Sequence, residues 1–257
     1  TGNDLDNIIT GNSGANVLTG GAGNDTYAVD NIGDAVVENA GAGTDTVINK
    51  LCWQSYTLGA NIENMSMAGY GQTGIGNGLD NTLTVTTFAA YTNDDVLNGG
   101  AGADTMSGGN GGDTYYVDNG GDVVIEASNY GTDTIKSSVS YTLSANVENM
   151  ELTGMDNINT IGNNLNNVLT GNSGDNMLDG GAGYDTLNGG SGNDLLNGGL
   201  DNDTLIGGAG NDVLEGADGN DTLSDTAGNN LLNGGAGADT LTGNIGNELF
   251  IGGTGND

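Results

Sequence analysis

From Gly162 to the last residue, large apolar residues recur at every ninth position without insertion or deletion. Each unit is a glycine-rich turn with an acid or amide in sixth place and a large apolar residue in eighth place. The eighth-place residues are Leu169, Leu178, Leu187, Leu196, Leu205, Leu214, Leu223, Leu232, Leu241 and Phe250. Strand side chains alternate between faces, so the eighth is predicted to point inward and its neighbours outward. Three residues of strand and six of turn form half a coil, which predicts an all-β, parallel β-roll or β-solenoid with 18 residues per coil.

The residues before Gly162 repeat on a longer scale. GGAGNDTYAVD (20–30) returns as GGNGGDTYYVD (108–118), and YTLGANIENM (56–65) returns as YTLSANVENM (141–150). Short runs of alternating apolar residues, bounded by Gly, Asn and Asp, predict strands in these modules, which we expect to form wider coils of the same solenoid. The predicted segments are degenerate nonads at 1–19, a first long spacer-containing module at 20–107, a second long spacer module at 108–161 and the continuous nonapeptide roll at 162–257.

The charge of the chain is strongly one-sided. It holds 34 acids against two bases, Lys50 and Lys136, with a net charge of −32, and it contains 51 Gly, no Pro and no His. No basic patch can form, which excludes nucleic acid and anionic membrane surfaces as partners. No apolar run reaches about 18 residues, so no membrane insertion is expected. The acids must be neutralised by cations or repel one another.

Stacking brings the acids of successive coils together. Sixth-place carboxylates about 4.8 Å apart would repel by about 3.5 kcal/mol per pair at an effective dielectric constant of about 20. A divalent ion between coils reverses the sign of that interaction. The available ligands are carboxylate and backbone carbonyl oxygens, which disfavour zinc and copper. Calcium accepts six to eight such oxygens in flexible geometry, whereas magnesium keeps its waters, so the sequence predicts multiple Ca²⁺ ions.

Units such as GGAGYDTLN (180–188) and GGSGNDLLN (189–197) resemble the GGxGxDxUx nonapeptide of RTX proteins, the bacterial calcium-binding parallel β-rolls. The resemblance implies that the sixth-place carboxylates bind calcium, with Asp95 in a degenerate unit. These are Asp25, Asp95, Asp104, Asp113, Asp185, Asp194, Asp203, Asp212, Asp221, Asp239 and Asp257. It also implies carbonyl ligands at first and third places, which are Gly180 with Ala182, Gly189 with Ser191, Gly198 with Leu200, and Gly207 with Ala209.

Sorting the sixth places by the 18-residue coil separates two edges. One edge carries only acids, and these are Asp185, Asp203, Asp221, Asp239 and Asp257. The opposite edge carries Asn176, Asp194, Asp212, Asn230 and Glu248. We therefore expect the first edge to fill with calcium and the second to fill unevenly, with a single doubly acidic pair at Asp194 and Asp212.

The outward seventh place alternates between Thr on one sheet and apolar residues on the other. The apolar column consists of Met177, Leu195, Val213, Leu231 and Leu249. Such stripes usually mark an interface, which predicts self-association or packing against another part of a parent protein. The alternative is a flattened roll in which this column forms a second, minor core.

The RTX resemblance implies a secreted, extracellular protein of the bacterial cell surface, exported by type I secretion and folded by external calcium. We expect a structural repeat module of a surface layer, extracellular fibre or adhesin, as a fragment of a longer protein. The alternative is the C-terminal folding and secretion module of a secreted enzyme such as a protease, lipase or alginate epimerase. Nothing in the chain resembles a catalytic constellation, so it is not expected to be an enzyme itself. Carbohydrate binding along one face would depend on exposed Tyr56, Tyr70, Tyr130 and Tyr141.

Overall fold

The computed structural model describes residues 1–86, 93–128, 131–243 and 246–257. The chain divides into two compact units, Thr1–Asp133 and Thr134–Asp257. Throughout the described residues there are strands and turns but no helix, and hence no helix able to cross a membrane. The all-β prediction is confirmed. The four segments drawn from sequence repeats stay a prediction, because they follow similarity rather than compactness.

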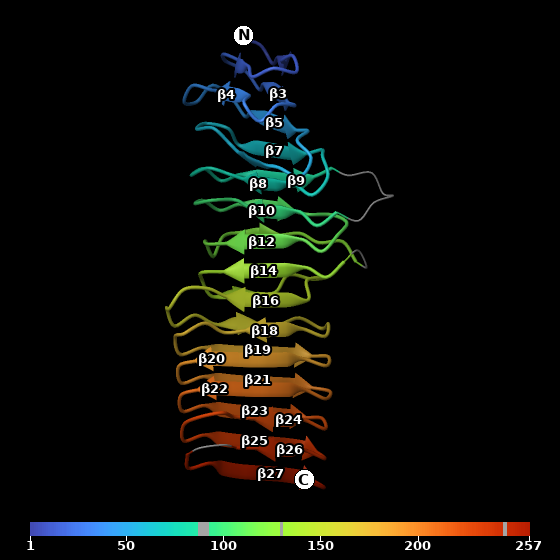
Figure 1. Cartoon of the computed structure of the whole chain (residues 1–257), viewed down its shortest axis with the longest axis vertical. Coiled ribbons are helices and arrows are strands. Elements are labelled where there is room, and N and C mark those ends of the chain that lie inside the picture. The colour runs from blue at the N-terminus through green and yellow to red at the C-terminus, as the bar shows by residue number, and fades with distance from the viewer. Residues whose placement is uncertain (87–92, 129–130, 244–245) are drawn as a thin grey trace. The chain divides into compact units, whose positions relative to one another are not determined.

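In unit 1 (Thr1–Asp133), alternate strands along the chain pair in parallel, so each coil contributes to more than one sheet (Figure 1). One sheet contains β1 (Ile8–Thr10), β3 (Thr26–Val29), β5 (Thr46–Asn49), β7 (Asn64–Met67), β9 (Thr82–Val85), β11 (Thr105–Ser107) and β13 (Val123–Val124). A second group contains β6 (Ser55–Thr57), β8 (Thr73–Ile75), β10 (Val96–Asn98) and β12 (Thr114–Val117). The strands β2 (Val17–Thr19) and β4 (Ala35–Val37) form a separate pair.

Unit 2 (Thr134–Asp257) repeats this arrangement with two sets of parallel strands. The first set is β14 (Thr134–Ser137), β16 (Asn149–Leu152), β18 (Val168–Thr170), β20 (Thr186–Ser191), β22 (Thr204–Ala209), β24 (Thr222–Ser224) and β26 (Thr240–Thr242). The second set is β15 (Tyr141–Thr142), β17 (Thr160–Ile161), β19 (Met177–Ala182), β21 (Leu195–Leu200), β23 (Val213–Asp218), β25 (Leu231–Gly237) and β27 (Leu249–Gly255). Each unit is therefore a parallel β-solenoid, as predicted.

The strand register gives the length of each coil. In the nonapeptide region Leu187 pairs with Leu205, which is the predicted 18-residue repeat. In unit 1 the coil widens where Tyr27 pairs with Val47, 20 residues on. The expectation of wider coils is wrong between β14 and β16, because Thr134 pairs with Asn149, only 15 residues on. There the intervening β15 has shrunk to two residues.

The core of unit 2 is the predicted inward column. The eighth-place leucines from Leu169 to Leu232 are fully buried, and each such side chain contributes about 1.5–3 kcal/mol. Leu241 is half-buried and Phe250 is 47% exposed, so the inward prediction is wrong at the end of the column. The reason is that Phe250 lies on β27, which pairs with β25 alone.

The strands in this region are longer than three residues. The strand β19 continues through the glycines of the turn, and Gly181 and Ala182 still pair with Gly199 and Leu200 one coil later. Gly181 adopts φ 99°, which lets the chain bend without leaving the ladder. The boundary between strand and turn predicted from apolar periodicity was therefore too early.

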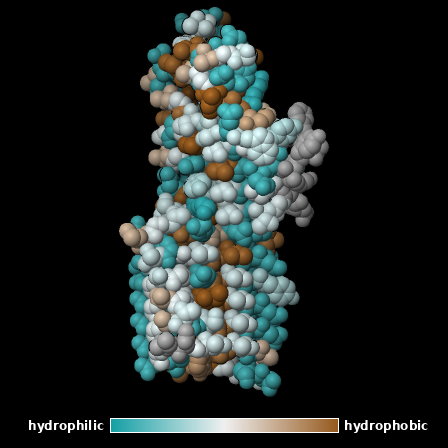
Figure 2. Space-filling view, in the orientation of Figure 1, coloured by the Kyte–Doolittle hydropathy of each residue, from teal (hydrophilic) through white to brown (hydrophobic). Residues whose placement is uncertain are grey.

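Two surface predictions are settled by burial. Met177, Leu195, Val213 and Leu249 are exposed and Leu231 is half-buried, so this apolar stripe does not form a second core. Figure 2 shows apolar side chains on the surface of unit 2 between two polar edges. The tyrosine face is wrong at Tyr56, which is buried, and Tyr130 lies outside the described residues.

Candidate metal sites

The sixth-place aspartates form ladders along both turn edges. One carboxylate oxygen of each, Oδ1, accepts the backbone N–H of the sixth-place residue one coil earlier. In unit 2 the N–H of Asp185 donates to Asp203 at 2.8 Å, and that of Asp194 donates to Asp212 at 2.7 Å. In unit 1 the N–H of Asp95 donates to Asp113 at 2.7 Å. This contact fixes each carboxylate and leaves the other oxygen, Oδ2, aimed at the turn.

These second oxygens are buried and lack hydrogen-bond partners within the part of the chain that the structure describes. They are the Oδ2 atoms of Asp25, Asp95, Asp104, Asp113, Asp185, Asp194, Asp203, Asp212, Asp221 and Asp239. Asp257 is exposed, although its Oδ1 accepts the N–H of Asp239 at 3.2 Å. A buried carboxylate oxygen without a partner is strongly destabilising. The repetition of this arrangement in coil after coil indicates that a cation is the missing partner.

The first-place glycines leave space for such a cation. A Cβ on Gly198 would stand 2.5 Å from Asp203 Oδ2 and 2.9 Å from the carbonyl oxygen of Gly216. At Gly180 the corresponding distances are 2.5 Å to Asp185 Oδ2 and 2.6 Å to the carbonyl of Gly198. A carboxylate oxygen and a carbonyl oxygen of the next coil therefore face the same glycine, which only an absent side chain permits.

This geometry places the predicted carbonyl ligands one coil away from the expected partner. The first-place carbonyls of Gly180, Gly189, Gly198 and Gly207 all face the glycine of the preceding coil. The third-place residues Ala182, Ser191, Leu200 and Ala209 lie on the strand ladders. The carbonyl of Ala209 accepts the N–H of Gly192 at 2.9 Å. The role of the third-place carbonyls as ligands stays a prediction.

Burial perturbs the carboxylates in the direction expected of groups that lack a counter-charge. Desolvation by burial raises the pKa of Asp203 to about 7 and that of Asp194 to about 6, against hydrogen bonds from the backbone that lower them. Desolvation likewise raises the pKa of Asp113 to about 8. All the converging atoms are oxygens, which suits a hard divalent cation such as calcium.

Several acids join these ladders that the nonapeptide register did not identify. Asp45 and Asp133 accept the N–H groups of Asp25 and Asp113, each at 2.7 Å. Asp34 and Asp122 do the same for Asn16 and Asp104, each at 2.9 Å. Each of the four is followed two residues later by a buried apolar residue: Val36, Val47, Val124 or Ile135. That aspartate-to-apolar spacing is the one found in the nonads and was the available signal.

Asp225 was also missed, because it replaces the glycine in first place. Its Oδ2 lies in the space beside Gly207, together with Oδ2 of Asp212. The next sixth place on this edge is Asn230, whose side-chain oxygen accepts the N–H of Asp212 at 2.7 Å. A first-place acid therefore supplies the second carboxylate that Asn230 lacks, and the weaker edge is less depleted of acid than its sixth places indicate.

The family comparison agrees with this geometry. The model of the RTX calcium-binding nonapeptide repeat (4 copies) matches residues 1–31, 90–124, 161–196, 188–223 and 224–257. The chain belongs to this RTX family. No curated protein matches it. The RTX chain is thus a calcium-binding repeat solenoid, and the buried unpartnered oxygens fit that ion.

We expect a methyl group at a first-place glycine to remove one RTX calcium site. In Gly198→Ala the new Cβ would occupy the space that Asp203 Oδ2 and the Gly216 carbonyl share. Calorimetric titration is expected to show about one bound ion fewer, with the remaining sites unchanged. Gly78→Ala is the matched control, since a Cβ there meets nothing within 4 Å. Equal calcium stoichiometry for the two variants would rule out the first-place cradle.

Proposed function

We propose that the chain is a calcium-rigidified structural module of a secreted bacterial surface protein, such as a surface layer, an extracellular fibre or an adhesin. The observation that supports this is the row of buried, unpartnered Oδ2 atoms at intervals of one coil along both edges. Without a cation these carboxylates oppose stacking, and with calcium they join successive coils.

This arrangement suits a protein that folds after export by type I secretion. In a compartment kept low in calcium the chain stays expanded, and calcium outside the cell closes the coils. The two long modules of unit 1 favour a structural role over the tail of a secreted enzyme, because an uninterrupted nonad run would suffice for the latter.

A calcium titration followed by circular dichroism tests the folding switch. We expect the main folding transition in the range of extracellular calcium modules, at about 10⁻⁴ to 10⁻³ M. Electron microscopy of the calcium-loaded chain, alone and joined to its neighbouring sequence, then tests for ordered arrays or fibres. A chain fully folded at cytosolic calcium would contradict folding after export.

We also propose that the apolar stripe of unit 2 mediates lateral self-association. Met177, Leu195, Val213 and Leu249 are 37–59% exposed and lie in register on paired strands. A continuous exposed column of this kind is typical of an interface. Its partner in the proposal is the same stripe on a second copy, since the strongly negative edges would repel each other and leave the apolar face as the contact surface.

Replacement of two stripe residues is expected to weaken assembly without changing calcium-dependent folding. In Leu195→Thr/Leu231→Thr the outer face becomes threonine-rich like the opposite sheet. Sedimentation velocity in calcium should show a lower oligomer fraction, and circular dichroism should show an unchanged calcium midpoint. Ile206→Thr, on the outer face of β22, is the control. Loss of folding in the double variant would contradict a purely intermolecular role.

A further inference from the structure

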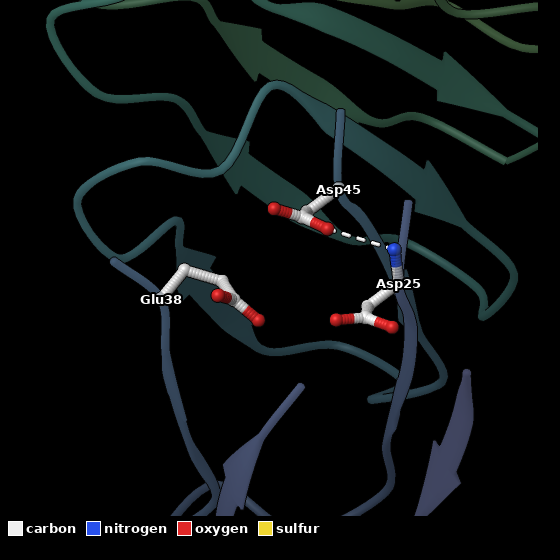
Figure 3. Close-up of side chains that lie close together, drawn as sticks. All are labelled: Asp25, Glu38 and Asp45. Atoms are coloured by element: carbon white, nitrogen blue, oxygen red, sulfur yellow. Dashed lines mark hydrogen bonds between the residues drawn. The ribbon is translucent and has the colours of Figure 1, made fainter. Parts of the chain in front are cut away.

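Unit 1 contains two three-carboxylate clusters that lie outside the nonapeptide pattern. One consists of Asp25, Glu38 and Asp45, and the other of Asp113, Glu126 and Asp133. Within each cluster, one oxygen from every carboxylate lies within 4.8 Å of the others, and all six residues are buried. Figure 3 shows the first cluster, in which the three carboxylates converge on one space. The two clusters occupy equivalent positions in the repeated long module.

The glutamate enters the cluster through a change at a first place. Glu38 lies 18 residues after Gly20, where a regular coil presents a glycine carbonyl instead of a side chain. Its Oε1 accepts the N–H of Gly20 at 3.1 Å, and its Oε2 accepts that of Asn39 at 3.2 Å. In the second cluster Glu126 Oε2 accepts the N–H of Ala127 at 3.1 Å. The backbone therefore holds an additional carboxylate over the turn.

A buried tyrosine hydroxyl points into each cluster. Tyr27 takes the eighth place that leucine holds in the regular nonads, and it is fully buried. Its hydroxyl and Asp25 Oδ2 both stand beside Gly20, and neither has a hydrogen-bond partner among the residues that the structure describes. Tyr115 repeats this position, where its hydroxyl accepts the N–H of Gly108 at 2.7 Å and donates to Glu126. A partnerless buried hydroxyl next to a partnerless carboxylate oxygen indicates a ligand between them.

The charges of the cluster point to the same kind of ligand. Burial, followed by repulsion from Asp95, Glu126 and Asp133, raises the pKa of Asp113. Burial and repulsion from Glu38, Glu63 and Asp25 raise the pKa of Asp45. Three buried carboxylates are stable together in the ionised state only with a compensating positive charge.

We propose that Asp25, Glu38, Asp45 and the Tyr27 hydroxyl form a second kind of calcium site, repeated at Asp113, Glu126, Asp133 and Tyr115, which binds calcium more tightly than the nonapeptide sites. A nonapeptide site offers one or two carboxylates with neutral carbonyls, whereas these sites offer three. Calcium affinity rises with the charge of the ligands and with their rigidity. The inference rests on the proposed function only in taking calcium as the ion.

A titration with calcium, and separately with Tb³⁺, tests the sites in the full chain. Wild-type protein is expected to show a class of about two ions that bind before the rest, at least about tenfold more tightly. In Glu38→Gln/Glu126→Gln, which preserves shape and removes one charge per site, that class should fall to the affinity of the others. Asp203→Asn is the control, since it alters a nonapeptide site and should leave the tight class intact.

Tyrosine-sensitised Tb³⁺ emission gives a second readout. At two equivalents of Tb³⁺, Tyr27→Phe/Tyr115→Phe should lose more than about half of the emission, because these hydroxyls lie among the proposed ligands. Tyr184→Phe, an exposed residue beside Asp185, should lose little. If the double glutamine variant does not fold in calcium, the single variant Glu126→Gln should retain one tight ion.

The outcomes separate this inference from the proposed function. A tight class that survives both glutamine substitutions overturns the three-carboxylate sites, while calcium-dependent folding of the same protein would still stand. Conversely, wild-type protein that keeps its β-structure in chelator contradicts calcium-driven folding, whatever the order in which its sites fill.

Discussion

Removal of divalent metal at pH 8 and low ionic strength is expected to abolish most of the β-sheet signal of this protein in circular dichroism. The sixth-place carboxylates of successive coils lie one strand spacing apart, and each such pair repels by about 3.5 kcal/mol at an effective dielectric constant of about 20. Calcium reverses this, since each site stabilises the fold by about 2.7 kcal/mol when free calcium is 100 times its Kd. The summed effect over many sites exceeds the usual stability of a domain.

Readdition of millimolar calcium should restore the signal, and two controls identify the cause. Magnesium at the same concentration should restore less, because it gives up its waters reluctantly and demands octahedral geometry. Sodium chloride screens exposed charges but screens buried pairs much less, so it should not replace calcium. Full β-structure after thorough chelation at low ionic strength would show that the buried oxygens need no ion.

The sequence predicted the parts of the fold that repeat without change. The inward leucines and the 18-residue coil follow from an unbroken period, and Leu187 facing Leu205 is its direct consequence. The ends are different: whether Phe250 is buried depends on a following coil, not on its own place in the period. Likewise, the 15-residue coil before Asn149 could not be read from a pattern that assumes a constant step.

The candidate sites were predictable only where all ligands share one register. Asp203 and Asp221 lie 18 residues apart in matching units, so their contact follows from the repeat. Glu38 and Asp45 join Asp25 from different places of a coil widened to 20 residues, and the apolar pattern alone assigns Tyr27 to the core. Three-dimensional closure, rather than local spacing, brings these groups together.

In the absence of metal, we expect acid to stabilise the fold rather than to weaken it. Burial raises the pKa values of the sixth-place carboxylates to about 6 in Asp95, Asp104 and Asp194, about 7 in Asp203 and about 8 in Asp113. The ion-free folded state therefore binds more protons than the unfolded chain, whose aspartates titrate at about 3.9. The stabilisation is fully present below that value and is lost as pH rises through about 6 to 8.

With calcium present the dependence on pH should reverse, because calcium binds the deprotonated carboxylates and protons compete with it. Protein stripped by chelating resin should gain β-sheet signal between pH 8 and pH 5, whereas the apparent calcium affinity of the same protein should fall over that interval. Asp203→Asn removes one titrating group from the ladder, so its metal-free stability should depend less on pH near 7. A metal-free signal that grows as pH rises would contradict the raised pKa values, since ionisation of unpaired buried carboxylates can only oppose the stacking of coils.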